Sequence, residues 1–532
     1  MSTNSNRRNI VMILCDQLRP DFLNAYGADF IPTPNIDALA ENGVVFDNAI
    51  TASTVCAPAR MSFFTGKNVS GHDAWTNGIP AKEGTEYLSE RLNAAGYMTA
   101  SVGLSDFSPN EENLGFQYKN AMLPHEPGCN FSKEFFEKYP EETTVFAENE
   151  DHSFKYPEED FLDRWATDRA TDFIKSYTET GKAPDGTAPE TEGAPFFLLC
   201  GFNSPHAPYV APQEVKGSVD TSKIPRIINQ QRPDEDIPEV ELFRRSFLNP
   251  PEVVKDPTIV EEERMELRRL YCELIVEVDN LVGRIVKALK DAGIYENTTI
   301  IFTSDHGSVE NDYNVVTKGP WPYKSQLFIP MIISNQPNLE KNTRCDALCG
   351  NLDIGATALD IAGDHKAFGV SRSMIGLADG TVAEREVNLS EFCDNCKTLV
   401  DKRYTFTYYP FSNKTCLFDR LNDPTEQNNL GGKPEYLELE RKFMMHIVDL
   451  MILAKGVRME AHDVTPGTRA GIEKKHPKFL DDFEIGMPLA NWTQVEWLEG
   501  YGLSGDYNEF CKDYEIKTEY GVYFRQPRPE KN

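Results

Sequence analysis

The hydrophobic positions along the chain predict an alternation of buried strands and amphipathic helices. Residues 8–16 form a mostly apolar run that ends on an aspartate, and residues 196–202 form a second, continuous apolar run. Runs of this length are typical of central strands in a largely parallel sheet. Residues 260–292 repeat apolar side chains at helical spacing, and residues 298–303 predict a strand after that long helix. The alternation predicts an α/β fold: a large mixed sheet flanked by helices, with its site at the strand carboxyl ends.

Shorter elements complete the predicted sheet and its helices. Apolar periodicity predicts helices over residues 36–42, 57–67 and 88–95, and a short strand over residues 97–102. Pro58 falls in the first turn of the second helix, where the missing N–H of proline does no harm. The start of that helix is therefore well defined by the sequence.

The domain organisation follows from the length and from a change in composition. A chain of 532 residues exceeds a typical single domain, so we expect a large domain and a smaller one. Because the last part is richer in aromatic and turn-forming residues, we predict a catalytic domain over residues 1–384 and a smaller C-terminal α+β subdomain over residues 385–532, with an aromatic-rich tail. Long loops over residues 107–160 and 206–257 are expected to shape the pocket.

The overall charge disfavours large anionic partners. The chain has 84 acidic and 54 basic residues, giving a formal net charge of −30. Such a surface repels nucleic acid and anionic membranes at long range. Because an acidic surface also serves solubility, the charge argues only against long anionic polymers as substrate. We expect no nucleic-acid or membrane partner, and a homo-oligomer is left open.

Short apolar segments and the cysteine pattern predict a cytoplasmic location. The apolar run of residues 10–15 is too short for a signal peptide, and no segment approaches the length of a transmembrane helix. The 11 cysteines are scattered and odd in number, which is not typical of a secreted disulfide framework. Cys393 and Cys396 form a C-x-x-C pair, but no second pair lies at zinc spacing, so reduced thiols are expected there.

The strongest candidate for chemistry is the sequence CAPAR of residues 56–60, which is followed by a threonine and a glycine at residues 65 and 66. It places Cys56 at the start of a predicted helix. Backbone N–H groups at a helix start, together with Arg60, favour an anion and the oxygens of an anionic substrate. Taken alone, the pattern also fits a structural helix start.

Two strand ends carry candidate metal ligands. Asp16 ends the first predicted strand, and Asp305 and His306 follow the strand of residues 298–303. Donors at the ends of such strands are expected to converge, and oxygen and nitrogen donors suit a divalent cation beside a nucleophile. One aspartate at a strand end is commonly a cap or a turn residue. Two such sites together are a stronger indication.

Taken together, these motifs resemble the sulfatase family of the alkaline phosphatase superfamily, over residues 8–435 and in the family's order. The resemblance implies that a maturation enzyme oxidises Cys56 to formylglycine, whose hydrate is the nucleophile. It also implies one divalent cation, whose expected ligands are residue 56, Asp16, Gln17, Asp305 and His306. Calcium is the expected ion, and the histidine ligand leaves manganese open.

Three further residues match positions at which the resemblance implies contacts to the substrate. Lys318 lies at the family's spacing after Asp305 and would grip a sulfate oxygen and residue 56. His206, in the sequence SPHAP, would protonate the leaving oxygen, although a histidine between two prolines also fits a stiffened loop. Asn77 matches an asparagine that contacts the transferred group in choline-sulfatase-like and phosphonate-hydrolase-like members.

Three positions depart from the sulfatase pattern. After a short strand the family commonly has G-K-x-H, whereas this chain has GLSD at residues 103–106. Leu104 and Asp106 therefore replace a lysine that would bind the sulfate and a histidine that would bind the diol of the hydrated formylglycine. Three roles are open for Asp106: a proton acceptor, a group that recognises a cationic substrate, or a helix cap. Gln17 stands where the family often has a second aspartate.

The predicted function is hydrolysis of a sulfate ester of a small or medium organic compound. The alternative is a hydrolase of the same fold that acts on phosphonate monoesters or phosphodiesters, which Gln17, His306 and the missing G-K-x-H favour. A third hypothesis is a catalytically inactive protein that senses an anion, and the presence of Cys56 and Lys318 argues against it. The partners expected for the leading prediction are a small sulfated molecule and a formylglycine-generating maturation enzyme.

Overall fold

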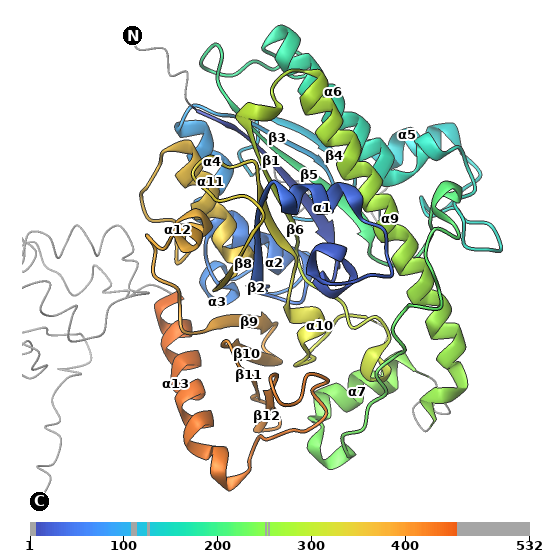
Figure 1. The fold of residues 1–532 in the computed structure, drawn as a ribbon, viewed down its shortest axis with the longest axis vertical. Helices are drawn as coiled ribbons and strands as arrows, with labels where there is room; N and C mark the ends of the chain where they lie inside the picture. Colours follow the sequence, from blue (N-terminus) through green and yellow to red (C-terminus); the bar gives the residue numbers. More distant parts are fainter. Residues whose placement is uncertain are drawn as a thin grey trace, which may run out of the picture. The chain divides into compact units, whose positions relative to one another are not determined.

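The computed structural model describes residues 7–107, 114–124, 128–249, 253, 256–315 and 317–454. They contain an eight-stranded sheet with the order β4-β3-β5-β1-β6-β7-β2-β8 (Figure 1). Its strands are β1 (Asn9–Asp16), β2 (Gly43–Ile50), β3 (Met98–Gly103), β4 (Tyr118–Ala121), β5 (Phe196–Pro205), β6 (Thr298–Ser304), β7 (Met331–Ser334) and β8 (Thr343–Gly350). Strand β7 runs antiparallel to its neighbours β6 and β2, and the other pairs are parallel. The predicted fold class, a large mixed sheet flanked by helices, is confirmed.

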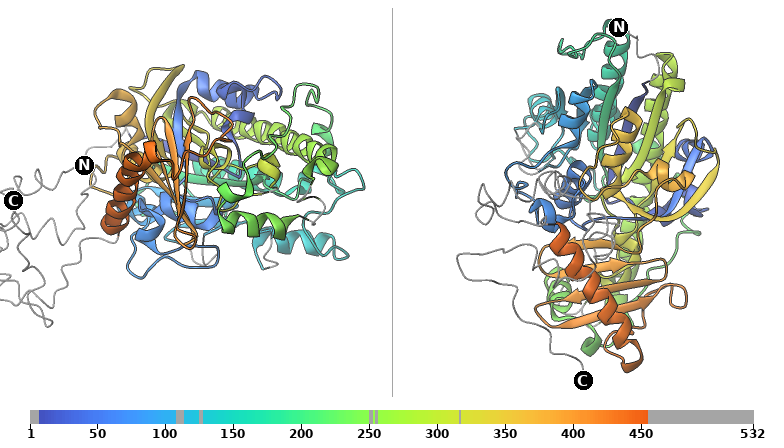
Figure 2. Two further views of the ribbon diagram at one scale, coloured as in Figure 1. Left: turned by 90° about the horizontal axis from the view of Figure 1, so that it is seen from below. Right: turned by 90° about the vertical axis from the view of Figure 1, so that its left-hand side faces the viewer.

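Helices cover both faces of this sheet (Figures 1 and 2). The helices of the described residues, on and away from this sheet, are α1 (Pro34–Glu41), α2 (Cys56–Thr65), α3 (Val69–His72), α4 (Leu88–Ala94), α5 (Asn130–Lys138), α6 (Leu162–Thr180), α7 (Glu239–Leu248), α9 (Glu261–Asp291), α10 (Lys324–Leu327), α11 (Ile354–Ala362), α12 (Met374–Asp379) and α13 (Leu437–Ala454). The long helix predicted over residues 260–292 is confirmed as α9. The helix predicted over residues 57–67 is confirmed as α2, which begins one residue earlier, at Cys56.

The central strand β1 shows how the two layers of the core form. It lies between β5 and β6 and is buried along its whole length. Because side chains alternate between the faces of a strand, Val11 and Ile13 pack into the core with side chains of α1, α6 and α9. Ile10 and Met12 point the other way and join a second cluster with side chains of α2, α4 and α11. The continuous apolar pattern of this strand is therefore explained by helices on both faces.

The edge at which the central strands end positions the site. Strands β5, β1 and β6 are parallel neighbours, with Ile10 paired to both Phe197 and Thr299 in register. Their carboxyl ends consequently meet at one edge, at Asp16 and beside Ser304. Polar groups that follow these strands in sequence are thereby brought together in space.

A small antiparallel sheet follows the large one along the chain. Its strands are β9 (Asn388–Phe392), β10 (Cys396–Val400), β11 (Tyr404–Tyr409) and β12 (Lys414–Asp419), and α13 packs on it through Phe443, whose ring stacks on Phe406 at 5.5 Å. Both sheets lie within residues 1–448, the first of two units into which the chain divides. The domain boundary after residue 384 stays a prediction, and the aromatic-rich tail lies outside the described residues.

Two segments expected to be loops contain regular structure. Residues 107–160 include β4 and α5, and residues 206–257 include α7. The second segment is anchored by Arg232, whose guanidinium donates to Glu241 at 2.9 Å with both side chains fully buried. A buried ion pair of this kind can fix a segment whose apolar residues do not recur at regular spacing. Hydrophobic periodicity alone therefore does not predict the regular structure of this segment. None of the helices in the described part of the chain is long and apolar enough to cross a membrane.

Candidate active site

Cys56 is the first residue of α2 and is only 4% exposed. Its Sγ atom lies 2.7 Å from the Nζ atom of Lys318, 3.3 Å from the Nε2 atom of His306 and 3.6 Å from the Oδ1 atom of Asp16. The structure therefore brings residues from the ends of β1 and β6 and from the loop before α10 onto the start of one helix. The sequence predicted each of them separately.

A side chain that lines the pocket accepts a hydrogen bond from a free backbone N–H group at the start of α2. The Val55 side chain makes no capping hydrogen bond, and the Oδ1 atom of Asn77 accepts from the backbone N–H of Ala57 at 3.1 Å. Because the carbonyl oxygen of Asn77 is used in this way, its amide N–H groups are the ones left for a ligand.

Four buried side chains form a cluster that could hold a metal ion. The ligand atoms of Asp16, Cys56, Asp305 and His306 all lie within 4.8 Å of one another. The Nε2 atom of His306 is 3.8 Å from Asp16 Oδ1 and 3.7 Å from Asp305 Oδ1. Carboxylate oxygens, an imidazole nitrogen and a sulfur atom that converge in a buried site are a donor set that a divalent cation can accept.

Arg60 lies behind this cluster and is fully buried. It donates to the second oxygen of each carboxylate, at 3.0 Å to Asp305 Oδ2 and 3.1 Å to Asp16 Oδ2. Its remaining Nη1 group donates to the carbonyls of Leu104 and Ser105. From the sequence, Arg60 is expected to favour the oxygens of the substrate. The geometry of Arg60 instead favours a positioning role, because all three of its guanidinium nitrogens donate to acceptors within the protein. Arg60 binds the Oδ2 atoms of the two aspartates and leaves their Oδ1 atoms on the side of the cluster.

The donor set fits a divalent cation in two further respects. The Nδ1 atom of His306 lies 2.8 Å from the Gly307 carbonyl, and an N–H there leaves the Nε2 lone pair directed at the cluster. Burial lowers the pKa of His306, in keeping with a neutral imidazole ligand. The buried Oε1 atom of Gln17 has no hydrogen-bond partner among the described residues. An unpaired buried amide oxygen costs about 1–3 kcal/mol, and a cation would remove that cost.

The charges around Cys56 are strongly coupled. Burial and the carboxylate of Asp16 raise the pKa of the Cys56 thiol, and Lys318 opposes them. Burial alone would lower the pKa of Lys318, but Cys56 and the carboxylates of Asp16 and Asp305 outweigh it, so the pKa is raised and the ammonium is kept charged. Lys318 is therefore a fixed cation at the position of the candidate nucleophile.

A pocket of about 300 Å³ opens onto this cluster. The residues that line it are Asp16, Cys56, Asn77, Leu104, Asp106, Leu123, Pro124, Asn203, His206 and Lys318. Leu104 and Asp106, two of the positions that depart from the sulfatase pattern, are thus pocket residues. Asp106 adopts a φ of 42°, and its carboxylate has no hydrogen bond or ion pair within the described ranges. Burial raises the pKa of Asp106, and Arg60 opposes the shift.

His206 lines the same pocket, on the loop after β5. Burial, with Lys318, lowers its pKa to about 4, so the free imidazole is neutral at neutral pH. The contact that holds the start of this loop is not predictable from the sequence. The buried carboxylate of Asp163 on α6 accepts from the backbone N–H groups of Asn203 at 2.7 Å and Ser204 at 2.9 Å. No sequence signal marks Asp163, because its partners are backbone groups forty residues further along the chain.

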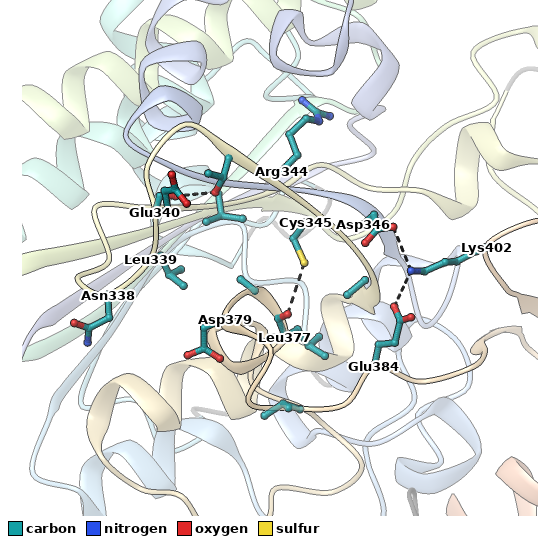
Figure 3. Close-up of a pocket in the computed structure, with 15 residues that line it drawn as sticks. Asn338, Leu339, Glu340, Arg344, Cys345, Asp346, Leu377, Asp379, Glu384 and Lys402 are labelled. Atoms are coloured by element: carbon teal, nitrogen blue, oxygen red, sulfur yellow. Dashed lines mark hydrogen bonds and ion pairs between the residues drawn. The ribbon is translucent and has the colours of Figure 1, made fainter.

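A larger cavity, of about 670 Å³, lies beside edge strand β8 and helix α12 (Figure 3). Figure 3 shows Lys402 between Asp346 and Glu384, at 3.3 and 3.0 Å, so its charge is already paired. The thiol of Cys345 faces the carbonyl of Leu377 at 4.0 Å. The cluster that could hold a metal lies in the smaller pocket, so chemistry and not volume identifies the candidate active site.

The fold and the site define the class of this protein. The ends of its central strands bring two aspartates and a histidine beside a cysteine at a helix start. The model of the sulfatase family matches residues 8–364, which is more than half of the sequence. The chain belongs to the sulfatase family. By class it is a sulfuric ester hydrolase.

Three known proteins illustrate the similarity. The multifunctional alkaline phosphatase superfamily protein PehA of Trinickia caryophylli is 27% identical over 500 residues, covering 82% of this chain and 94% of that protein. An arylsulfatase of Clostridium perfringens is 28% identical, covering 81% and 91%. The phosphonate monoester hydrolase of Agrobacterium radiobacter has the same fold, with a TM-score of 0.70 at 21% identity, covering 84% of this chain and 96% of that one.

Proposed function

We propose that this protein hydrolyses a sulfate ester of a small or medium organic compound, with formylglycine made from Cys56 as its nucleophile. The observation that carries the proposal is the position of Cys56. It begins α2, touches Lys318 and faces the carboxylate of Asp16 in the pocket. The CAPAR sequence adds the signature that a maturation enzyme would read. The similarity to a named arylsulfatase supports the same reaction.

The residues around position 56 have distinct tasks in this proposal. The hydrated aldehyde of formylglycine supplies an attacking hydroxyl and a second hydroxyl whose proton loss expels sulfate. Lys318 binds an oxygen of the transferred group as a fixed cation, and the amide N–H groups of Asn77 donate to another. Arg60 holds the two aspartates, so that both keep one oxygen toward the nucleophile.

His206 is the proposed acid for the leaving oxygen. Its pKa of about 4 in the free site means that it is neutral before substrate binds. An anionic ester beside the imidazole favours the protonated form and raises this pKa toward the range in which general acids work. The hydrogen bonds from Asn203 and Ser204 to Asp163 keep the loop with His206 in place.

The proposal includes one divalent cation, with calcium as the preferred ion and manganese as the second choice. Asp16, Asp305, His306 and residue 56 would hold it, with the free oxygen of Gln17 as a further ligand. A cation there would supply Lewis-acid stabilisation of negative charge on the reacting oxygens.

A second candidate function, hydrolysis of phosphonate monoesters or phosphodiesters, is favoured by the wall of the pocket at Leu104 and Asp106. Neither side chain is cationic, so within the described lining Lys318 is the fixed positive charge. Both sulfate monoesters and phosphonate monoesters carry a single negative charge and need less neutralisation than a phosphate monoester dianion. The similarity in fold to a phosphonate monoester hydrolase points the same way.

One kinetic comparison tests the two functions. The protein is produced together with a maturation enzyme. It is assayed with a sulfate monoester, a phosphonate monoester and a phosphate monoester that all carry the same aryl leaving group. The proposal predicts the highest kcat/KM for the sulfate, a lower one for the phosphonate and poor activity on the phosphate. Faster turnover of the phosphonate monoester than of every aryl or sugar sulfate would assign the function to the second candidate.

A further inference from the structure

Gln17 is held at every polar atom except one. Its backbone N–H donates to Asp305 Oδ1 at 3.1 Å, and its carbonyl accepts from the hydroxyl of Tyr271 at 2.8 Å. Its side-chain Nε2 donates to Ser308 Oγ at 3.0 Å. The remaining atom, Oε1, has no partner in the part of the chain that the structure describes, on a residue that is 1% exposed.

Ser308 determines which end of this amide points where. Its hydroxyl donates to Glu310 Oε1 at 2.6 Å. A serine has a single hydroxyl proton, so the lone pairs of Ser308 are what remains for Gln17, and only the N–H end of an amide can bind them. The carboxylate of Glu310 thus dictates the direction of the Ser308 proton, and Ser308 in turn dictates the direction of the Gln17 amide.

We propose that Ser308 and Glu310 are positioning residues that turn the amide oxygen of Gln17 toward the metal site. A glutamine presents either a donor or an acceptor, whereas an aspartate at this position presents an acceptor in either orientation. The pair makes a neutral amide act as a dedicated oxygen ligand. The inference rests on the metal site proposed above, and it adds two residues that the predicted ligand set does not contain.

The burial and backbone conformation of Ser308 and Glu310 indicate that the fold holds both residues in place. Ser308 and Glu310 are both fully buried, and Glu310 has a positive φ of 45°. A non-glycine residue in this region is strained, and such strain persists where surrounding contacts enforce it. The Oε1 atom of Glu310 also accepts from the hydroxyl of Tyr209 at 2.7 Å, on the loop that follows His206. Tyr209 therefore provides a matched control, because it binds the same carboxylate oxygen without touching Gln17.

The test is a metal-binding cycle on the full chain, read by calorimetric titration of chelator-treated protein with Ca²⁺ and repeated with Mn²⁺. Ser308→Ala removes the acceptor that orients Gln17, and we expect a 10- to 100-fold loss of affinity, about the range measured when a partner of a metal ligand is removed. Ser308→Thr keeps a hydroxyl and is expected to restore binding. Tyr209→Phe is expected to bind the ion as the wild type does.

A second background separates orientation from a general structural effect. In the Gln17→Glu background both side-chain oxygens accept, so Ser308→Ala should leave Ca²⁺ affinity nearly unchanged. Equal losses in both backgrounds, or unaltered binding by Ser308→Ala in the Gln17 background, would overturn the inference. The thermal unfolding midpoints of the metal-free variants show that each one folds. Wild-type protein that binds neither Ca²⁺ nor Mn²⁺ would instead contradict the proposed metal site itself.

Discussion

The pocket around Cys56 has two walls that are built differently. The metal-side wall consists of Asp16, Cys56, Asp305 and His306, at the ends of central strands and the start of α2. Its groups are buried and bound to Arg60, Lys318 or each other. The loop-side wall consists of Leu104, Asp106, Leu123 and Pro124, from the segments after β3 and β4.

This difference indicates that one wall carries out the reaction and the other selects the substrate. The metal-side wall contains Cys56 and Asp305, which match the sulfatase pattern, and its groups are buried and hydrogen-bonded, so we expect it to carry the chemistry that the family shares. The loop-side wall departs from that signature and leaves the Asp106 carboxylate without a partner among the described residues. We therefore expect changes in the first wall to abolish the reaction, and changes in the second to alter which substrate is used.

Cys56→Ala should have the largest effect. Loss of a covalent nucleophile lowers turnover by about six orders of magnitude in well-studied hydrolases, and we expect a loss of that size in kcat with an unchanged fold. Steady-state rates and the thermal unfolding midpoint measure the two effects. Cys345→Ala, in the cavity beside β8, is the matched control and should retain full activity. Appreciable turnover by Cys56→Ala would remove this residue from the reaction.

Asp305→Ala should be next, because it removes a candidate metal ligand and the partner of a buried guanidinium. The salt bridge from Arg60 Nε to Asp305 Oδ2 is 3.0 Å long with both side chains fully buried. Leaving Arg60 without this partner should cost about 3–5 kcal/mol in stability. Elemental analysis should show loss of the bound cation together with loss of activity. Wild-type activity that survives exhaustive chelation would count against the metal.

His206→Gln should discriminate between leaving groups. An acid that protonates the leaving oxygen contributes about 10²- to 10⁴-fold, and this contribution is needed most for alcohols of high pKa. We expect a large fall in kcat for alkyl or sugar sulfates and a small one for nitrophenyl sulfate. The measurement is a plot of log kcat against leaving-group pKa, which should steepen in the variant. Equal losses across the series would show that His206 acts in another way.

Asp106→Asn should have the smallest effect of these changes. A charge-assisted hydrogen bond contributes about 1.5–3 kcal/mol, so kcat/KM for the natural substrate should fall by about 10- to 100-fold. The loss should lie in kcat if Asp106 accepts a proton, and in KM if it binds a cationic group of the substrate. Full activity would reduce Asp106 to a helix cap. That hypothesis concerns residues 108–113, which lie outside the described residues.

The convergence of the residues in the metal-side wall could be predicted from the sequence. Asp16 and Asp305 end apolar runs that are long enough to be central strands, and parallel strands bring their ends together. The start of α2 was predictable to within one residue from Pro58. Local patterns worked here because the positions of these groups follow from the sheet itself.

Other parts of the site were not predictable, because they depend on contacts between distant segments. The direction of Arg60 is set by carboxylates and carbonyls far along the chain. Asp163 acts through backbone N–H groups, which no side-chain pattern records. The Ser308–Glu310 pair depends on a serine proton whose direction only a folded network fixes.

The central claim is that residue 56 becomes formylglycine, and mass spectrometry of the peptide that contains it tests this most directly. The protein is produced with and without a maturation enzyme, digested, and the peptide with the CAPAR sequence is measured. The account predicts that co-production replaces the thiol by a carbonyl oxygen, with the corresponding loss of mass, and that sulfatase activity rises in proportion to the converted fraction. A thiol that stays intact beside an active maturation enzyme, or activity that does not follow conversion, would contradict it.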